Sequence, residues 1–119
     1  MSVTVEVCGL TIEGRHGVGE QERANPQPFV YDLWLDVGEA AFSDRIEDAV
    51  DYRAVTACVR EISDGRQFHL LEALAAAVAD AVVERFAVER VRVRVRKPDV
   101  RLEAPVEYTA ATVDRGRTR

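Results

Sequence analysis

Residues that form metal sites and disulfides are scarce in this chain, whose 119 residues include two cysteines and two histidines. His16 and His69 have no second ligand near them in the sequence, so no structural zinc site is expected. Cys8 and Cys58 lie in apolar patterns without metal-ligand spacing. A disulfide between them is one interpretation, and the one we favour is two buried thiols in a cytoplasmic protein.

Long hydrophobic runs are also absent from the sequence, since no stretch approaches the roughly 20 apolar residues that a membrane span requires. The opening MSVTVEVCGL alternates like a β-strand and does not have the form of a signal peptide. Basic residues are outnumbered, with 16 Lys and Arg against 21 Asp and Glu and a net charge of −5. Nucleic-acid binding depends on neutralising phosphates with basic side chains. We therefore expect a cytoplasmic protein with neither a membrane nor a nucleic-acid partner.

The pattern of apolar residues predicts four strands and two helices in a single domain spanning residues 1–119. Alternation predicts strands at 3–13, 29–37, 89–98 and 105–114, and spacings of three and four residues predict helices at 51–64 and 70–86. Asp51 is the candidate N-cap of the first helix. We expect a long loop at 14–27, an irregular segment at 39–50 and a disordered tail at 115–119.

The order ββααββ predicts an α+β fold in which a four-stranded antiparallel sheet carries two amphipathic helices on one face. The other face carries polar residues of three strands, namely Glu6, Asp32, Asp36, Arg92 and Arg94. Acidic residues opposite basic ones favour cross-strand ion pairs. This face is either exposed to solvent or the wall of a polar channel, formed when several copies join their sheets into a ring. A chain this short gains additional core from such association.

Four short segments carry side chains that are suited to chemistry. They are GRHGVGEQE at 14–22, VDY at 50–52, FHLLEAL at 68–74 and RKPD at 96–99. Each alone is equally compatible with a solvent-exposed loop or a helix cap. A carboxylate in the first turn of a helix, such as Glu72, commonly stabilises the helix dipole. Lys97 by itself would be one more basic residue in an arginine-rich strand.

In combination these segments resemble the dihydroneopterin aldolase family in order and spacing, over about residues 3–98. The resemblance is carried by HGV followed by Glu22, by DRIEDAVDY and LLEALA, and by a strand that ends in KP. It implies the tunnelling fold, in which subunits join their strands into an oligomeric barrel, and a homo-octamer of two stacked tetramers with sites at subunit contacts. It also implies a pterin substrate and an aldehyde lyase of folate biosynthesis that needs no Schiff base, metal or other cofactor.

The resemblance assigns substrate recognition to residues at the start of the two helices and in the first loop. Glu72 would accept two hydrogen bonds from the 2-amino group and N3–H of the pterin, much as a carboxylate accepts from arginine. Backbone groups of Leu71 and Val50 would complete recognition of this ring edge. Glu22 would bind or orient the hydroxylated side chain, and Tyr52 would lie against the ring.

The resemblance assigns proton transfer to Lys97 as general acid or base, together with Tyr52 and Glu22. The implied reaction is a retro-aldol cleavage of 7,8-dihydroneopterin that releases glycolaldehyde and leaves 6-hydroxymethyl-7,8-dihydropterin. The N5=C6 imine of the pterin takes up the electrons, so the protein has to position the ring and move protons. Pro98 would keep Lys97 extended, because proline disfavours the α region at the residue before it.

The chain departs from the family pattern after Pro98, where DVRLEAP replaces the usual proline-rich loop of the PIPG type. Pro28 also stands where a basic or small residue commonly precedes the phenylalanine. The related dihydroneopterin triphosphate epimerase is the alternative, because YRAVTACVREI resembles both enzymes, although HGV and KP have the aldolase form. A non-catalytic pterin- or purine-binding ring is a third hypothesis. It would keep Glu72 without a base, and the presence of both Tyr52 and Lys97 argues against it.

Overall fold

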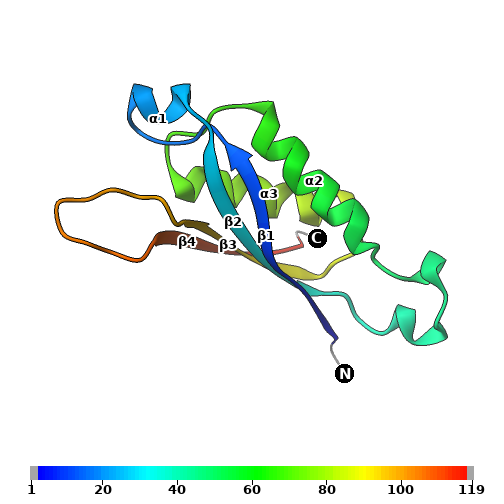
Figure 1. Ribbon diagram of the computed structural model, residues 1–119. Helices are drawn as coiled ribbons and strands as arrows, with labels where there is room; N and C mark the ends of the chain where they lie inside the picture. Colours follow the sequence, from blue (N-terminus) through cyan, green and yellow to red (C-terminus); the bar gives the residue numbers. More distant parts are fainter. Residues whose placement is uncertain (1–2, 118–119) are drawn as a thin grey trace.

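The computed structural model describes residues 3–117 and contains a four-stranded antiparallel sheet with helices on one face (Figure 1). The strands are β1 (Thr4–Gly14), β2 (Gln27–Asp36), β3 (Arg90–Lys97) and β4 (Thr109–Gly116), paired in the order β1-β2-β3-β4. The helices are α1 (Glu20–Ala24), α2 (Tyr52–Gly65) and α3 (Leu71–Arg85), with 3₁₀ turns at Ala40–Ser43 and Ile46–Asp48. The predicted α+β class, with the order ββααββ for its strands and long helices, is confirmed.

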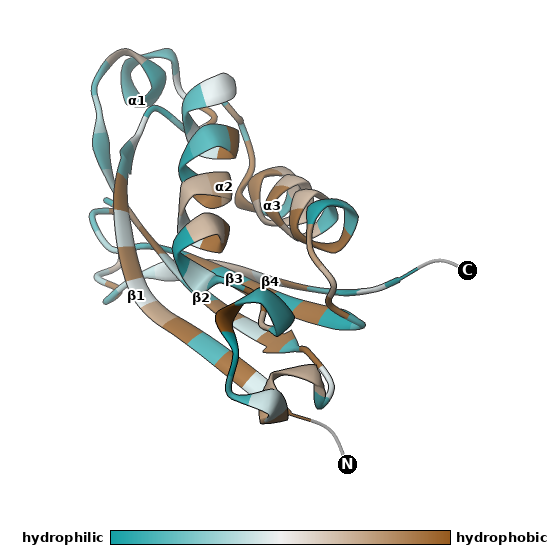
Figure 2. Cartoon of the chain, turned by 90° about the vertical axis from the view of Figure 1, so that its right-hand side faces the viewer, coloured by the Kyte–Doolittle hydropathy of each residue, from teal (hydrophilic) through white to brown (hydrophobic). Residues whose placement is uncertain are grey.

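The hydrophobic core lies between the sheet and the two long helices, which Figure 2 shows side by side over one face of the sheet. Alternation along β2 and β3 places every second side chain on this face. The fully buried ones are Phe29, Tyr31, Leu33, Leu35, Val91, Val93 and Val95. Each of the buried Phe, Leu and Val side chains stabilises the fold by about 1.5–3 kcal/mol. Helix α3 packs over β3 and β4. This packing fixes the position of the start of α3 relative to the end of β3.

Both long helices form close to where the sequence predicts them. Helix α2 follows Asp51, whose side chain accepts a hydrogen bond from the Arg53 N–H at 2.9 Å and so caps the first turn. It ends at Gly65, next to the predicted stop. Helix α3 is shorter than predicted by one residue at each end. No helix within residues 3–117 is long and apolar enough to cross a membrane.

A β-bulge interrupts β1 at Cys8 and Gly9, which together lie opposite Asp32 on β2. Gly9 has a φ of 74°, in the left-handed region that glycine adopts without strain. The bulge directs the Gly9 N–H to Asp32, whose Oδ1 accepts it at 2.8 Å. Cys8 itself is exposed, on the same side of β1 as Thr4 and Glu6, so the prediction of two buried thiols is wrong for Cys8. Cys58 is buried, and both thiols are free.

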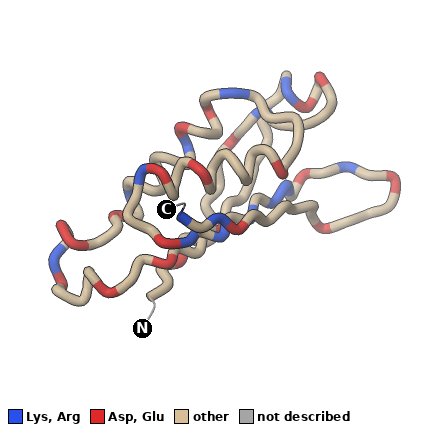
Figure 3. Tube along the Cα trace, turned by 180° about the vertical axis from the view of Figure 1, so that it is seen from behind, with Lys and Arg blue, Asp and Glu red and all other residues tan. Residues whose placement is uncertain are grey.

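The sheet face away from the long helices carries acidic and basic residues in facing pairs, interspersed along the strands in Figure 3. Asp32 lies opposite Arg94, and Arg92 lies opposite Asp114. Asp32 is 2% exposed. Its Oδ2 is 2.8 Å from a terminal guanidinium nitrogen of Arg94 and 3.1 Å from Nε of Arg96. The predicted cross-strand pairing is confirmed, and Asp32 itself is buried rather than solvated.

A long projecting loop, residues 98–108, joins β3 to β4 (orange in Figure 1). Pro98 has no N–H to donate, so β3 ends at Lys97, and Lys97 pairs with Thr109. Strand β4 therefore begins at Thr109, and the predicted start at residue 105 is wrong. The predicted disordered tail is also wrong for Arg115 and Gly116, which belong to β4. Residues 118–119 of that tail lie outside the described residues.

Candidate active site

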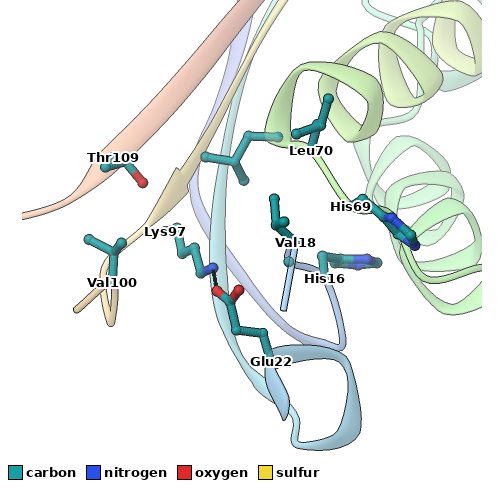
Figure 4. Close-up of a pocket in the computed structure, with 10 residues that line it drawn as sticks. His16, Val18, Glu22, His69, Leu70, Lys97, Val100 and Thr109 are labelled. Atoms are coloured by element: carbon teal, nitrogen blue, oxygen red, sulfur yellow. Dashed lines mark hydrogen bonds and ion pairs between the residues drawn. The ribbon is translucent and has the colours of Figure 1, made fainter. Parts of the chain in front are cut away.

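A pocket of about 170 Å³ lies at one end of the sheet, where β3 meets the loop after β1 and the start of α3 (Figure 4). Its walls come from three segments that are far apart in the sequence, within residues 16–22, 69–71 and 97–109. The lining residues are His16, Gly17, Val18, Glu22, His69, Leu70, Leu71, Lys97, Val100 and Thr109. Three of the six predicted site residues, Glu22, Leu71 and Lys97, thus line one pocket.

Lys97 and Glu22 point toward each other in this pocket and form an ion pair through Nζ and Oε1 (Figure 4). The side chain of Lys97 is 10% exposed, whereas that of Glu22 is 40% exposed. The hydrogen bond from Lys97, followed by one from the Gly19 N–H at 2.9 Å, lowers the pKa of Glu22. A carboxylate and an ammonium are therefore held together, and such a pair can pass protons to and from a bound molecule.

Glu22 reaches the pocket because the glycine-rich loop folds back on itself as the short helix α1. Gly17 permits this path, since a Cβ at Gly17 would lie 2.6 Å from the Cβ of Glu22. The guanidinium of Arg23 stabilises the loop by donating to the carbonyls of Gly17 at 3.0 Å and Val18 at 2.6 Å. The sequence predicts only a loop here, because the five residues of α1 are too few to show a helical period.

The other three predicted site residues do not line this pocket within one chain. Glu72 lies in the first turn of α3 and is exposed to solvent. Tyr52 is the first residue of α2 and is 59% exposed, while Val50 packs against the core just before that helix. Helix α2 has 14 residues and is therefore about 20 Å long. Its far end contacts the pocket wall, where Ser63 bonds to His16, so Tyr52 and Val50 lie a helix length away.

Several pocket residues were not predictable as site residues. Val18 and Leu70 are apolar yet 69% and 51% exposed, and exposed apolar side chains beside a pocket are a signal of a binding surface. Val100 lies in the segment that departs from the family pattern, and Thr109 reaches the pocket only through the pairing of β3 with β4. The sequence marks His16 only as a member of the glycine-rich loop.

The described part of the chain offers no cluster of metal ligands. Within residues 3–117, no group of three or more His, Cys, Asp or Glu side chains is placed to hold a metal ion. His16 and His69 both line the pocket, but both ring nitrogens of His16 already have protein partners. The chemistry of the pocket therefore centres on Lys97 and Glu22.

The comparisons with known proteins all indicate the same family. The family model described as dihydroneopterin aldolase matches residues 5–114. The dihydroneopterin aldolase of Methylorubrum extorquens is 34% identical over 121 residues, which cover 99% of this chain and 93% of that protein. The dihydroneopterin aldolase of Streptomyces coelicolor is 35% identical, over 95% of this chain and 97% of its own length. The crystal structure of E. coli dihydroneopterin aldolase in complex with neopterin has a TM-score of 0.87 at 27% identity, covering 96% of this chain and 99% of that one.

A four-stranded antiparallel sheet with two long helices on one face, and a lysine–glutamate pair at its end, define a chain of the tunnelling-fold class. The match extends over nearly the whole chain and does not depend on any single motif. The chain belongs to the dihydroneopterin aldolase family. The resemblance carried by HGV, LLEALA and KP is thereby confirmed.

Proposed function

We propose that this chain is a dihydroneopterin aldolase of folate biosynthesis, which cleaves 7,8-dihydroneopterin into 6-hydroxymethyl-7,8-dihydropterin and glycolaldehyde. The observation that carries the proposal is the ion pair of Lys97 and Glu22 in the pocket of a chain from this family. The pterin substrate has further support from the E. coli relative, whose crystal structure is a complex with neopterin. The expected location of the enzyme is the cytoplasm.

In the proposed reaction, the bond between C1′ and C2′ of the substrate side chain breaks. A base removes the proton of the 2′-hydroxyl group, and C2′ leaves as the aldehyde carbon of glycolaldehyde. The electron pair of the broken bond moves to C1′ and is delocalised into the N5=C6 imine of the ring. Protonation of C1′ then gives the hydroxymethyl product. Because the ring takes up the electrons, the mechanism uses no Schiff base, metal or other cofactor.

The residues of the pocket suit these steps. Lys97 would move the protons, because its side chain is nearly buried in the pocket and its Nζ already donates to a carboxylate. Glu22 would orient the hydroxylated side chain of the substrate with its partly exposed carboxylate. Glu72 would anchor the 2-amino and N3–H edge of the ring, beside the backbone of Leu71, with the N-terminus of α3 stabilising its negative charge.

The proposal includes Tyr52 and Val50 through a neighbouring subunit of a homo-octamer made of two stacked tetramers. The pocket of about 170 Å³ in one chain is small, since sites for small molecules typically measure roughly 300–1,000 Å³. Tyr52 is exposed and lies a helix length from the pocket of its own chain. Strands β1 and β4 are the edges of the described sheet, where strands of another copy can pair. Tyr52 of one copy would then lie against the pterin bound beside Lys97 of the next.

Product analysis tests the proposal. The purified chain is incubated with 7,8-dihydroneopterin, and separately with its triphosphate, and glycolaldehyde, 6-hydroxymethyl-7,8-dihydropterin and the 2′-epimer are measured. We expect the first two products from the unphosphorylated substrate. Formation of the epimer alone, or turnover of the triphosphate alone, would establish the epimerase alternative, which the atypical segment at Val100 beside the pocket favours. Pterin binding without turnover would identify a non-catalytic ring.

A further inference from the structure

His16 is buried at the junction of two pocket walls, although it belongs to a glycine-rich loop. It is 2% exposed. Its ring packs edge-on against Phe29, with 5.0 Å between centroids, and lies 5.5 Å from the ring of Phe68. Gly14 leaves the space for this ring, because a Cβ at Gly14 would lie 2.7 Å from Cδ2 and Nε2 of His16. The surrounding residues therefore fix the imidazole in one place.

Both ring nitrogens of His16 have protein partners, and these partners determine the tautomer. The Phe68 N–H donates to Nδ1 at 3.0 Å, so Nδ1 carries no proton. Nε2 therefore carries the proton and donates to Oγ of Ser63 at 3.1 Å. Burial lowers the pKa of His16, and the charge of Asp64 opposes this effect only in part. The neutral ring is the form that satisfies both contacts.

The backbone of Phe68 is hydrogen-bonded on both sides to the loop that carries Glu22. Its N–H donates to the His16 ring, and its C=O accepts the Gly17 N–H at 2.9 Å. Gly17 lies directly against Glu22, and Phe68 is followed closely by Leu71, where α3 begins. These two hydrogen bonds, which we call the Phe68 clamp, join the pocket wall that holds Glu22 to the wall that holds Leu71.

We propose that His16 is a positioning residue for the cleavage reaction, and that its neutral imidazole keeps the Glu22 wall and the Leu71 wall at the spacing the substrate requires. This inference rests on the proposed function. His16 does not act as an acid or base itself, because both nitrogens are occupied and its ring is turned away from the pair of Lys97 and Glu22 (Figure 4). A displacement of reacting groups by about 1 Å can cost on the order of 10²-fold in rate.

The geometry of the clamp makes it sensitive to pH. A proton added at Nδ1 would face the Phe68 N–H, so two donors would oppose each other and the clamp would open. The Asp64 carboxylate on α2 acts on the ring itself. The ionisable groups beside its partners are the Tyr31 phenol on β2, which is affected by Ser63 and Asp64, and the Arg66 guanidinium, which lies 4.2 Å from the Phe68 ring centroid. Burial raises the pKa of Tyr31 to about 12, so this phenol stays uncharged. Because burial lowers the pKa of His16 from its ordinary value, the clamp is closed at neutral pH and opens in acid.

Two substitutions of His16 separate positioning from packing. His16→Asn keeps an acceptor near the place of Nδ1, whereas His16→Leu keeps most of the volume and removes the acceptor. We expect His16→Leu to lower kcat by on the order of 10²-fold, and His16→Asn to recover most of that loss. Val78→Ala, a fully buried core position of α3, is the matched control. It should lower Tm and leave kcat unchanged. The wild-type kcat should also decrease in acid, and His16→Asn should lack the part of this decrease that comes from the imidazole.

Two further measurements detect the hydrogen bonds of the Phe68 clamp in the absence of substrate. They therefore test the inference even if the chain does not cleave dihydroneopterin. Nitrogen NMR should find a neutral ring protonated at Nε2. Hydrogen exchange of the Gly17 amide should be slow in the wild type and in His16→Asn, and fast in His16→Leu. A ring protonated at Nδ1, unchanged exchange in His16→Leu, or equal kcat in all three proteins would overturn the inference. A loss in His16→Asn as large as that in His16→Leu would overturn it as well.

Discussion

The ammonium of Lys97 donates to the carboxylate of Glu22 across 75 positions of the sequence. Lys97 is fixed as the last residue of β3, where it pairs with Thr109, and Glu22 is fixed by the fold-back of α1. Both charges are therefore held in place before any ligand binds. Groups that are preorganised in this way lose little free energy to reorganisation when a reaction redistributes charge.

Replacement of Lys97 should affect chemistry more than binding. We expect Lys97→Ala to lower kcat by roughly 10²–10⁴-fold, the usual contribution of a positioned acid or base. The KM should change little, because we propose that Glu72 and the backbone of Leu71, and not Lys97, recognise the ring edge. Steady-state kinetics with 7,8-dihydroneopterin measure both quantities. Arg92→Ala is the control from the same strand, since Arg92 pairs with Asp114 on the other face of the sheet and should keep full kcat. Full turnover by Lys97→Ala would mean that another group moves the protons.

Replacement of Glu72 should affect binding more than folding. We expect Glu72→Gln to weaken neopterin binding by about 2–4 kcal/mol, because a charge-assisted pair of hydrogen bonds would be lost. The fold should be retained, since Glu72 is exposed in the first turn of α3. Titration calorimetry gives the affinity. Asp80→Asn on the same helix removes an exposed ion pair with Arg115 and should bind normally. An unchanged affinity in Glu72→Gln would contradict its role as the pterin anchor.

Mixed subunits can test whether Tyr52 acts in the site of a neighbouring copy. Tyr52→Ala and Lys97→Ala chains should each be nearly inactive as homo-oligomers. When they are dissociated together and reassembled, some sites combine an intact Tyr52 with an intact Lys97, so activity should exceed the sum of the two parents. Sedimentation should show an octamer for the wild type. A fully active monomer, or mixing that restores nothing, would show that the site does not span two subunits.

Asp32 should contribute to stability in a pH-dependent way. Burial raises its pKa, but hydrogen bonds from the Gly9 N–H, Arg94 and Arg96 outweigh burial and hold the pKa below the usual 3.8. The unfolded chain therefore binds this proton at higher pH than the folded chain. The stabilisation is present above the unfolded-state pKa and is lost as the pH falls through the folded-state pKa.

The corresponding prediction is that Asp32→Asn lowers the free energy of unfolding by roughly 1–3 kcal/mol at neutral pH. The difference from the wild type should shrink in acid, as the pH falls through the lowered folded-state pKa of Asp32. Denaturant unfolding at both pH values measures it. Asp36→Asn, at the end of the same strand, is the control and should change stability little. A difference that does not depend on pH would show that the charge of Asp32 is not what stabilises the sheet.

Most of the fold was predictable because the apolar residues of its long helices and strands recur with a clear period. The alternation of Arg and Val in β3 reflects a sheet with one face under the helices and the other polar. The errors occur where tertiary structure overrides a local pattern. The bulge at Cys8 and Gly9 moves the inward-facing side chains of β1 from odd positions, Val5 and Val7, to even positions, Leu10 and Ile12, which a single alternating period does not anticipate. The start of β4 depends on where Pro98 ends its partner strand, and residues 105–114 alone do not show that position.

The candidate site was predictable only in part. Family motifs identify Glu22 and Lys97, but no local pattern shows that they touch, because their contact depends on the path of the whole sheet. Val100 lines the pocket from an irregular loop that has no period to recognise. The environment of His16 depends on a backbone donor at Phe68, 52 positions away, which no spacing rule can anticipate.

The pocket draws its walls from residues 16–22, 69–71 and 97–109, so it does not exist until the chain has folded almost from end to end. While β4 has not yet emerged from the ribosome, a nascent chain has no complete binding surface. A ligand therefore recognises only the finished fold, and its binding free energy adds to global stability rather than to that of one local segment. Saturation with a pterin should slow amide exchange in strands on both sides of the sheet, far beyond the residues that it touches.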